Sequence, residues 1–324
     1  MPAARDVVHR QVEVSDGSIH LVEQGEGPLV LLLHGFPESW RSWRHQLPAL
    51  AAAGYRAVAI DLRGYGDSLV PEPVEEYRML AHVADNVAVL RALDAPTAAV
   101  VGHDWGSPIA AASALMRPDL FTALGLLGVP YAPRSPMRPT EAFAHAGGDD
   151  EFYVSYFQHP GQAEAEIEAD IRGWLIGFYV ALSGESGRRH VDVFTIPPGA
   201  TMREKLPAGA QPPSWLSPED LDASVRSFGR TGVAGALNRY RNVDRDWEDL
   251  AAWDGLSIKQ PAIYIGGELD ASAMWLADAI EAHGTTLPGF AGNHILDGCG
   301  HWVQQERPAE VNRLLLDWLA GTPA

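Results

Sequence analysis

The sequence has very little cysteine, almost no lysine and no long apolar run. Of its 324 residues one is a cysteine, Cys299, which excludes an internal disulfide and a cysteine-rich metal site. No apolar stretch is long enough to cross a bilayer, and the first residues lack the basic-then-apolar layout of a secretory signal. We therefore expect a cytoplasmic protein.

Positive charge is also scarce. The chain has 24 Lys and Arg residues against 42 Asp and Glu residues, a formal net charge of −18. Nucleic acids and anionic membranes attract clustered cations, so we expect neither as a partner. Hydrophobic residues make up 46% of the chain, enough to bury a full core. These numbers predict an ordinary globular protein, and they leave open whether it is a monomer or a homodimer.

Short apolar segments alternate with helix-like segments in the first part of the chain. The apolar segments are 28–35, 56–64, 98–104 and 123–130, and the helix-like segments are 40–53, 76–93 and 106–117. This alternation is typical of a parallel sheet with crossover helices, so it predicts the α/β class. Segments 8–14 and 18–24, joined by the turn sequence SDGS, predict an antiparallel hairpin at one edge of the sheet.

The strand pattern stops after Pro130 and returns at PAIYIGGELD, residues 261–270. The intervening patterns predict helices over 164–182 and about 217–250, and a last helix follows at 302–320. Between the first two, 183–215 reads as a long irregular stretch, which is typical of a functional loop and predicts the rim of a pocket. We expect residues 1–130 and 255–324 to form the core domain and residues 131–254 to form a helical lid.

The segment GHDWGS, residues 102–107, follows an expected strand and precedes an expected helix. Small residues on both sides of a lifted side chain are typical of the nucleophile elbow, and here the lifted residue is Asp104. Alternatively, Asp104 caps the following helix, because aspartate is a good N-cap residue. Capping alone does not require glycine on both sides. Ser107 lies past the turn, which argues against a serine esterase.

An elbow predicts an acid and then a histidine on loops that follow later strands. Asp270 follows the apolar segment PAIYIGG, and His301 lies in the glycine-containing loop CGHW. Glu268 is an alternative to Asp270 as the acid. His283 falls in a helical stretch. His294 is expected at the start of the last strand, around NHILDG at residues 293–298, which puts it on the opposite side of the sheet from the elbow. The order therefore favours Asp270 and His301.

Backbone amides that stabilise an oxyanion are expected just after the nucleophile and after an earlier strand. These are the amides of Trp105 and of Phe36, which lies in HGFPESW at residues 34–40. An ordinary strand-to-helix turn is the alternative for that segment. We expect His34, Phe36, Pro37 and Trp105 to line the substrate pocket, and we predict a cis peptide bond before Pro37.

The motifs HGFPESW, DLRGYGDS, GHDWGS and CGHW, in this order, resemble those of the epoxide hydrolases of the α/β-hydrolase fold. The resemblance continues in FYVSYFQHPGQAEAEIEADIRGWL and LNRYRNVDRDW, which are similar to the two lid segments that carry the epoxide-binding tyrosines of that family. It covers nearly the whole chain, and 183–213 is the least matched part. It implies a mostly parallel eight-stranded sheet with helices on both faces and an inserted helical lid.

The resemblance also implies the chemistry. The implied roles are nucleophile for Asp104, base for His301, partner of the base for Asp270, and activation of the epoxide oxygen for Tyr153 and Tyr240. Tyr156, one helical turn after Tyr153, is the alternative for the first tyrosine. The implied reaction converts a small lipophilic epoxide and water to a vicinal diol through an ester on Asp104, with no metal or organic cofactor.

Two other functions share parts of this pattern, because a fold and a triad do not define a reaction. A haloalkane or haloacid dehalogenase would use the same aspartate, and Trp105 could bind the halide. However, Phe36 stands where such enzymes commonly have an asparagine that binds the halide. Many of those enzymes also carry the acid of the triad after the sixth strand, where this chain has LGVPYAP and no acidic residue. A ligand-binding protein that has lost turnover would lack a triad residue or a tyrosine, and none is missing.

Overall fold

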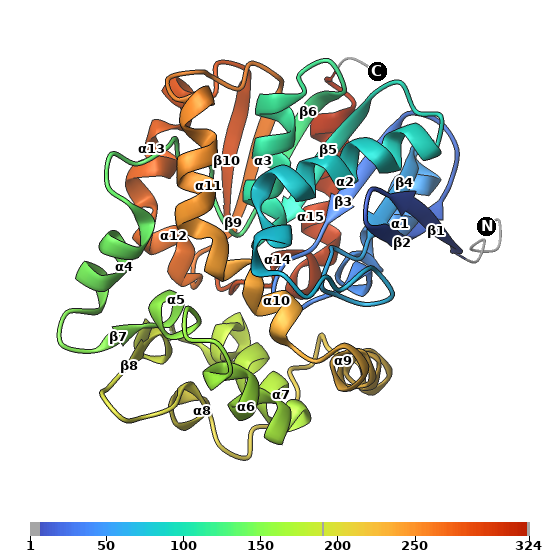
Figure 1. Cartoon of the computed structure of the whole chain (residues 1–324). Coiled ribbons are helices and arrows are strands. Elements are labelled where there is room, and N and C mark those ends of the chain that lie inside the picture. Colours follow the sequence, from blue (N-terminus) through green and yellow to red (C-terminus); the bar gives the residue numbers. More distant parts are fainter. Residues whose placement is uncertain (1–6, 190, 323–324) are drawn as a thin grey trace.

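An eight-stranded sheet organises the molecule, which is a computed structural model describing residues 7–189 and 191–322. The strand order is β1-β2-β4-β3-β5-β6-β9-β10 (Figure 1). β1 and β2 pair antiparallel, as do β2 and β4, and the remaining neighbours are parallel. The predicted mostly parallel sheet with an antiparallel hairpin at one edge is confirmed. The strands are β1 (Val8–Val14), β2 (Gly17–Gln24), β3 (Leu29–Leu33), β4 (Arg56–Ile60), β5 (Ala98–His103), β6 (Phe121–Leu127), β9 (Ala262–Gly267) and β10 (Phe290–Leu296).

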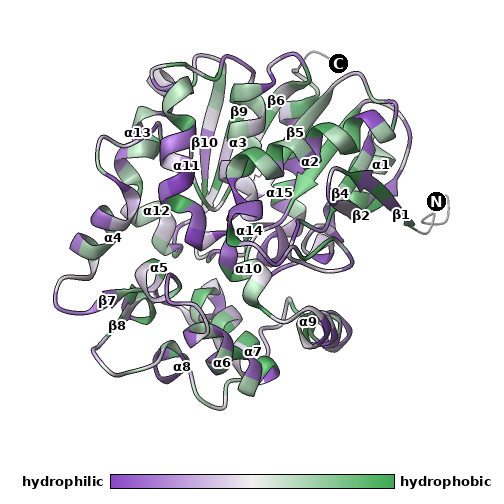
Figure 2. Ribbon diagram, in the orientation of Figure 1, coloured by the Kyte–Doolittle hydropathy of each residue, from purple (hydrophilic) through white to green (hydrophobic). Residues whose placement is uncertain are grey.

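Helices cover both faces of the sheet, so its central strands are buried on both sides. In β3, Leu29, Leu31 and Leu33 join the apolar cluster under α2 and α3, whereas Val30 and Leu32 join the cluster under α1 and α15. Successive side chains of a strand point to opposite faces, which explains the unbroken apolar sequence. Figure 2 shows the central strands mainly in the hydrophobic colours. These helices are α1 (Gln46–Ala52), α2 (Met79–Ala92), α3 (Gly106–Met116) and α15 (Pro308–Leu319).

A long segment is inserted between β6 and β9, which are neighbours in the sheet. In Figure 1, α5 to α9 gather beyond the end of the sheet where β9 leads into α12. The elements of this segment are α4 (Pro139–Gly147), β7 (Glu151–Phe152), α5 (Tyr153–Tyr156), α6 (Gln162–Ala169), α7 (Ile171–Leu182), η3 (Gly184–Ser186), η4 (Val191–Phe194), β8 (Thr195–Ile196), α8 (Met202–Lys205), α9 (Pro218–Thr231), α10 (Ala234–Asn238), η5 (Tyr240–Asn242), α11 (Val243–Asp249) and η6 (Leu250–Trp253). The remaining elements are η1 (Trp40–Trp43), η2 (Val74–Tyr77), α12 (Ala271–Trp275), α13 (Ala277–Thr286) and α14 (Val303–Glu306).

Local capping and proline divide the helices more finely than the apolar patterns predict. The expected helix 164–182 is two helices, because the Asp170 side chain accepts a hydrogen bond from the Gly173 amide and starts α7. The last helix is likewise divided at Pro308, the first residue of α15. Across the described ranges, no helix is both long and apolar enough to span a bilayer.

The stretch 183–215 is more ordered than an irregular loop. It contains η3, η4, β8 and α8, and β8 pairs antiparallel with β7. Thr201 caps α8 by accepting a hydrogen bond from the amide of Glu204. The expectation of an irregular stretch was therefore wrong in this part. A helix or strand of two to four residues is too short to show a periodic pattern of apolar residues, so the sequence pattern does not predict it.

The start of α3 lies so close to β3 that only glycine fits at residue 106. A Cβ atom on Gly106 would lie 2.1 Å from the backbone oxygen of Leu33. We expect Gly106→Ala to lower the free energy of unfolding by roughly 1–3 kcal/mol, measured by urea denaturation. Gly229→Ala in α9 is the control, since no described atom lies within 4 Å of its added Cβ. This variant should be unchanged or up to about 1 kcal/mol more stable. Equal stability of the two variants would contradict the argument.

Candidate active site

Asp104 occupies a strained turn between β5 and α3. Its φ is 51°, in the left-handed region that a non-glycine residue adopts at a cost of roughly 1–3 kcal/mol. The residue that caps α3 is Trp105, and its cap has no side-chain hydrogen bond. The alternative in which Asp104 caps the helix is therefore not what the structure shows. Instead the turn lifts the carboxylate above the end of the sheet.

His301 lies between two carboxylates that come from different loops. Its Nδ1 atom is 2.9 Å from Oδ2 of Asp270, and its Nε2 atom is 3.5 Å from Oδ2 of Asp104. Asp270 directly follows the turn after β9, and its Oδ1 atom accepts a hydrogen bond from the Ser272 amide. The structure thus brings together the three residues that the chain order predicts. The result is an acid, a histidine and a second carboxylate in line.

The rejected candidates lie elsewhere in the structure. Oε2 of Glu268 accepts a hydrogen bond from the Gly298 amide, 2.8 Å away. Nδ1 of His283 lies 2.8 Å from the side-chain oxygen of Asn293. His294 lies within β10, which begins at Phe290, so the expectation that this histidine starts the strand was wrong.

The loop after β3 supplies a backbone donor to Asp104. The amide of Phe36 donates to Oδ1 of Asp104 at 2.7 Å. The Phe36–Pro37 peptide bond is cis, which confirms that prediction. The carbonyl of Pro37 accepts a hydrogen bond from the hydroxyl of Tyr179, 2.8 Å away. This contact ties the loop to α7 of the inserted segment.

His34 is placed differently from the expectation that it lines the pocket. Its side chain is fully buried behind the loop, where Nε2 accepts a hydrogen bond from the Leu62 amide at 3.0 Å. Nδ1 lies 2.8 Å from the carbonyl of Gly35. The turn directs the His34 ring into the core, where its two contacts hold the loop after β3 in place.

A cavity of about 820 Å³ opens over Asp104. Trp105 and Tyr153 belong to its wall, which is otherwise mainly apolar. Lining residues from the inserted segment include Phe143, Phe152, Val154 and Val191, and those from α12 and the residue after it include Met274, Trp275 and Leu276. A pocket with a mainly apolar wall and few charged groups, here Asp104 and Asp192, suits a small lipophilic molecule.

Two tyrosines of the inserted segment approach Asp104. Tyr153 begins α5 and Tyr240 begins η5, and their ring centroids are 6.0 Å apart. Both rings are close enough to Asp104 for its charge to raise their pKa. The hydroxyl of Tyr156 instead donates to Oε2 of Glu166 at 2.7 Å, away from this pair. The geometry therefore favours Tyr153 over Tyr156.

Opposing effects determine the charge of Asp104 and His301. Burial opposes ionisation of Asp104, but the hydrogen bond and charge of His301, with the charge of His103 and the amide of Phe36, lower the pKa of Asp104 below its usual value. Burial also opposes a charged His301, but the adjacent carboxylates of Asp270 and Asp104 raise its pKa well above the usual value. The resting site therefore holds a carboxylate next to an imidazolium.

Burial favours the neutral, protonated form of the two tyrosines. It raises the pKa of Tyr153 and of Tyr240, and the negative charge of Asp104 adds to the effect. Both phenols therefore keep their protons at any physiological pH. Neutral phenols next to a carboxylate can donate hydrogen bonds to an oxygen that becomes negative.

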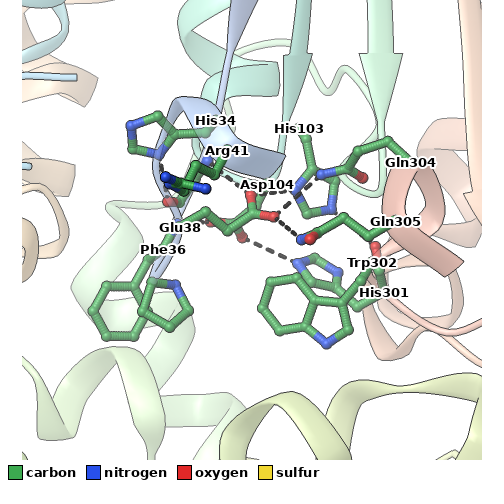
Figure 3. A network of polar contacts seen from close by, with 12 residues as sticks. His34, Phe36, Glu38, Arg41, His103, Asp104, His301, Trp302, Gln304 and Gln305 are labelled. Atoms are coloured by element: carbon green, nitrogen blue, oxygen red, sulfur yellow. Dashed lines mark hydrogen bonds and ion pairs between the residues drawn. The ribbon is translucent and has the colours of Figure 1, made fainter. Parts of the chain in front are cut away.

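Sequence reasoning missed a buried polar network behind the site (Figure 3). Nδ1 of His103 lies 2.7 Å from Glu38, and its Nε2 lies 2.8 Å from the carbonyl of His301. The other oxygen of Glu38 accepts hydrogen bonds from Gln304 and Gln305. Glu38 lies inside the motif HGFPESW and His103 inside GHDWGS. These two polar residues were the sequence signal that could have revealed the network.

Comparison with known proteins finds a family model, relatives and solved structures similar to this chain. Residues 28–308 match the family model described as the alpha/beta hydrolase fold. Epoxide hydrolase B of Mycobacterium tuberculosis is 40% identical over 97% of this chain and 98% of that protein. The structure of an epoxide hydrolase from an endophytic Streptomyces is 65% identical, with a TM-score of 0.94 over 97% of this chain and 96% of that one. Epoxide Hydrolase A from Mycobacterium thermoresistibile is 41% identical, with a TM-score of 0.92 over 98% and 99% of the two chains.

The charge of Asp104 should control the protonation of His301. A negative neighbour favours the imidazolium, so we expect Asp104→Asn to lower the pKa of His301. The measurement is a histidine NMR titration of the two proteins. Asp119→Asn is the control, because Asp119 forms an exposed ion pair with Arg117. An unchanged His301 pKa in Asp104→Asn would show that the two groups are not coupled.

Proposed function

The chain belongs to the epoxide hydrolases of the α/β-hydrolase fold, and we propose that it converts small lipophilic epoxides to vicinal diols through an ester on Asp104. One observation carries this proposal. Asp104 and the protonated phenol of Tyr153 line one mainly apolar cavity, with His301 and its acid next to the carboxylate and the ring of Tyr240 6.0 Å from that of Tyr153. The carboxylate suits the substrate, because an epoxide offers a strained sp³ carbon rather than a carbonyl. An ionised carboxylate can displace the ring oxygen without first losing a proton.

In the first step Oδ2 of Asp104 attacks the epoxide carbon, while the amide of Phe36 holds Oδ1. The carbon–oxygen bond of the ring breaks, and its electron pair goes to the ring oxygen. Tyr153 or Tyr240 donates its proton to that oxygen, and the other phenol donates a hydrogen bond. The products are an alkyl ester, a free hydroxyl and one phenolate. The proton of His301 then restores the phenol.

Ester formation turns His301 into a base. The ester of Asp104 is neutral, so one of the two charges that raise the pKa of His301 disappears. Neutral His301 takes a proton from water, and the hydroxide formed attacks the ester carbonyl. The amides of Phe36 and Trp105 stabilise the oxyanion, and Asp270 stabilises the imidazolium. When this intermediate collapses, the diol oxygen leaves and takes the proton that the attacking hydroxide carried. Asp104 is then ionised and His301 protonated, as before the reaction.

We further propose that residues 131–254 act as a lid that activates the substrate. Tyr153 and Tyr240 come from this segment, whereas Asp104, Asp270 and His301 come from 1–130 and 255–324. The scheme needs no metal or organic cofactor. The cytoplasmic location stays a prediction from the sequence, and the choice between a monomer and a homodimer stays open.

The covalent step makes an isotopic prediction. A single turnover with excess enzyme in heavy-oxygen water should give a diol without solvent label, because its new oxygen comes from Asp104. Repeated turnover, as the control, should give labelled diol. We expect no diol from Asp104→Ala and accumulation of the ester, seen by intact mass, in His301→Gln. Solvent label in the first diol would mean direct hydration. Release of halide from haloalkanes with no diol from epoxides would favour a dehalogenase.

The two lid tyrosines predict a selective loss of rate. We expect Tyr153→Phe and Tyr240→Phe each to slow ring opening by about a hundredfold, because general acid catalysis contributes typically 10²–10⁴. The rate is measured by stopped-flow tryptophan fluorescence. Tyr156→Phe is the matched control and should open the ring at the wild-type rate, since the Tyr156 hydroxyl binds Glu166. A slow Tyr156→Phe with a normal Tyr153→Phe would reverse the assignment.

A further inference from the structure

We propose that Arg239 is a positioning residue for ring opening, which acts on Tyr240 through the indole of Trp105. The inference rests on the proposed function, in which Tyr240 donates to the epoxide oxygen. Arg239 directly precedes Tyr240 in LNRYRN and is 2% exposed. Its guanidinium carbon lies 4.7 Å from the centroid of the Trp105 ring. A buried cation on the ring next to the nucleophile is thus placed where it can influence the reaction.

Contacts on the other side fix the guanidinium in this position. Arg239 donates a hydrogen bond to the carbonyl of Tyr77 and forms an ion pair with Asp246. Asp246 in turn accepts a hydrogen bond from the amide of Met79 at 2.6 Å. Burial lowers the pKa of Arg239 to about 9, which leaves it charged at neutral pH. The cation is therefore held between the start of α2 and the indole.

The indole connects this cation to the phenol. The rings of Trp105 and Tyr240 meet edge to face, with centroids 5.1 Å apart and planes at 84°. The hydrogen bond from the Trp105 side chain lowers the pKa of Tyr240, against the larger rise caused by burial. In this proposal the indole N–H donates to the phenol oxygen, which leaves the proton of Tyr240 free for the substrate oxygen. The ring contact between Trp105 and Tyr240 is the geometry that permits this arrangement.

A cation on the face of an indole strengthens the donor at its edge. The guanidinium attracts the electron density of the ring, so the N–H group becomes more positive. Hydrogen bonds in series polarise one another, and the phenol of Tyr240 should become a better acid. The benefit appears only when negative charge develops on the substrate oxygen, which is the ring-opening step.

Arg241 offers a matched comparison on the same turn of chain. It is also an arginine and is 9% exposed. Its side-chain partners belong to the inserted segment: the carbonyls of Phe157 and His159, the side chain of Asn238 and the carboxylate of Glu164. Loss of Arg241 should therefore test the packing of this region without altering the indole contact.

The experiment separates ring opening from ester hydrolysis by stopped-flow and quenched-flow measurements with an aryl epoxide. We expect Arg239→Gln to slow ring opening about tenfold, Arg239→Lys to recover part of the loss, and Arg241→Gln to change ring opening less than about twofold. Ester hydrolysis should change much less than ring opening in Arg239→Gln. Thermal unfolding of each variant checks that it is folded.

A double-mutant cycle measures whether the effects of Arg239 and Tyr240 on the rate of ring opening depend on each other. A purely structural role of Arg239 would give additive losses. If Arg239 acts through Tyr240, then Arg239→Gln should add no further slowing in a Tyr240→Phe background. Additive losses, or equal losses in both steps, would overturn the inference. If Arg239→Gln does not fold, Arg239→Lys with Trp105→Phe gives the same cycle, because phenylalanine lacks the N–H group. Absence of an ester in the wild type would instead refute the proposed function.

Discussion

The burial of one negative charge constrains the rest of the site. A carboxylate that leaves water loses hydration, and protein groups must replace it. At Asp104 these groups are the amide of Phe36 and the imidazolium of His301, which come from loops far apart in the chain. The positive φ of Asp104 adds a local cost. The close approach of α3 to β3 at Gly106 shows how tightly the fold encloses this turn.

In the proposed mechanism the same charge serves as nucleophile and regulates the base. While Asp104 is ionised, the two adjacent carboxylates raise the pKa of His301 well above its usual value and favour the imidazolium. Ester formation removes one of these charges, so neutral His301 forms more easily once there is an ester to hydrolyse. Asp270 alone then stabilises the cation that forms.

Parallel strands made much of this arrangement predictable from the sequence. Their carboxyl ends meet at one edge of the sheet, so motifs after β3, β5 and β9 had to lie close together. The direction of each side chain was harder to predict. The turn after β3 sends His34 into the core, whereas the backbone amide of Phe36 donates to Asp104 and the Phe36 ring packs against that of Tyr240. Tyr153 and Tyr156 lie about one helical turn apart, but the hydroxyl of Tyr156 binds Glu166 whereas the ring of Tyr153 lies next to that of Tyr240. Contacts of this kind depend on tertiary packing, which a periodic pattern does not contain.

The division of labour between the two parts of the chain has a mechanistic consequence. In the proposed reaction the core supplies the nucleophile and the hydrolytic base, and the inserted segment supplies the phenols that stabilise the opened oxygen. On this scheme ring opening depends on both parts, whereas ester hydrolysis depends chiefly on the core. Arg239 spans the boundary, because it binds the carbonyl of Tyr77 from the core and lies over the ring of Trp105, the residue after Asp104. A contact that secures the insertion to the core therefore also lies against the indole that packs on Tyr240.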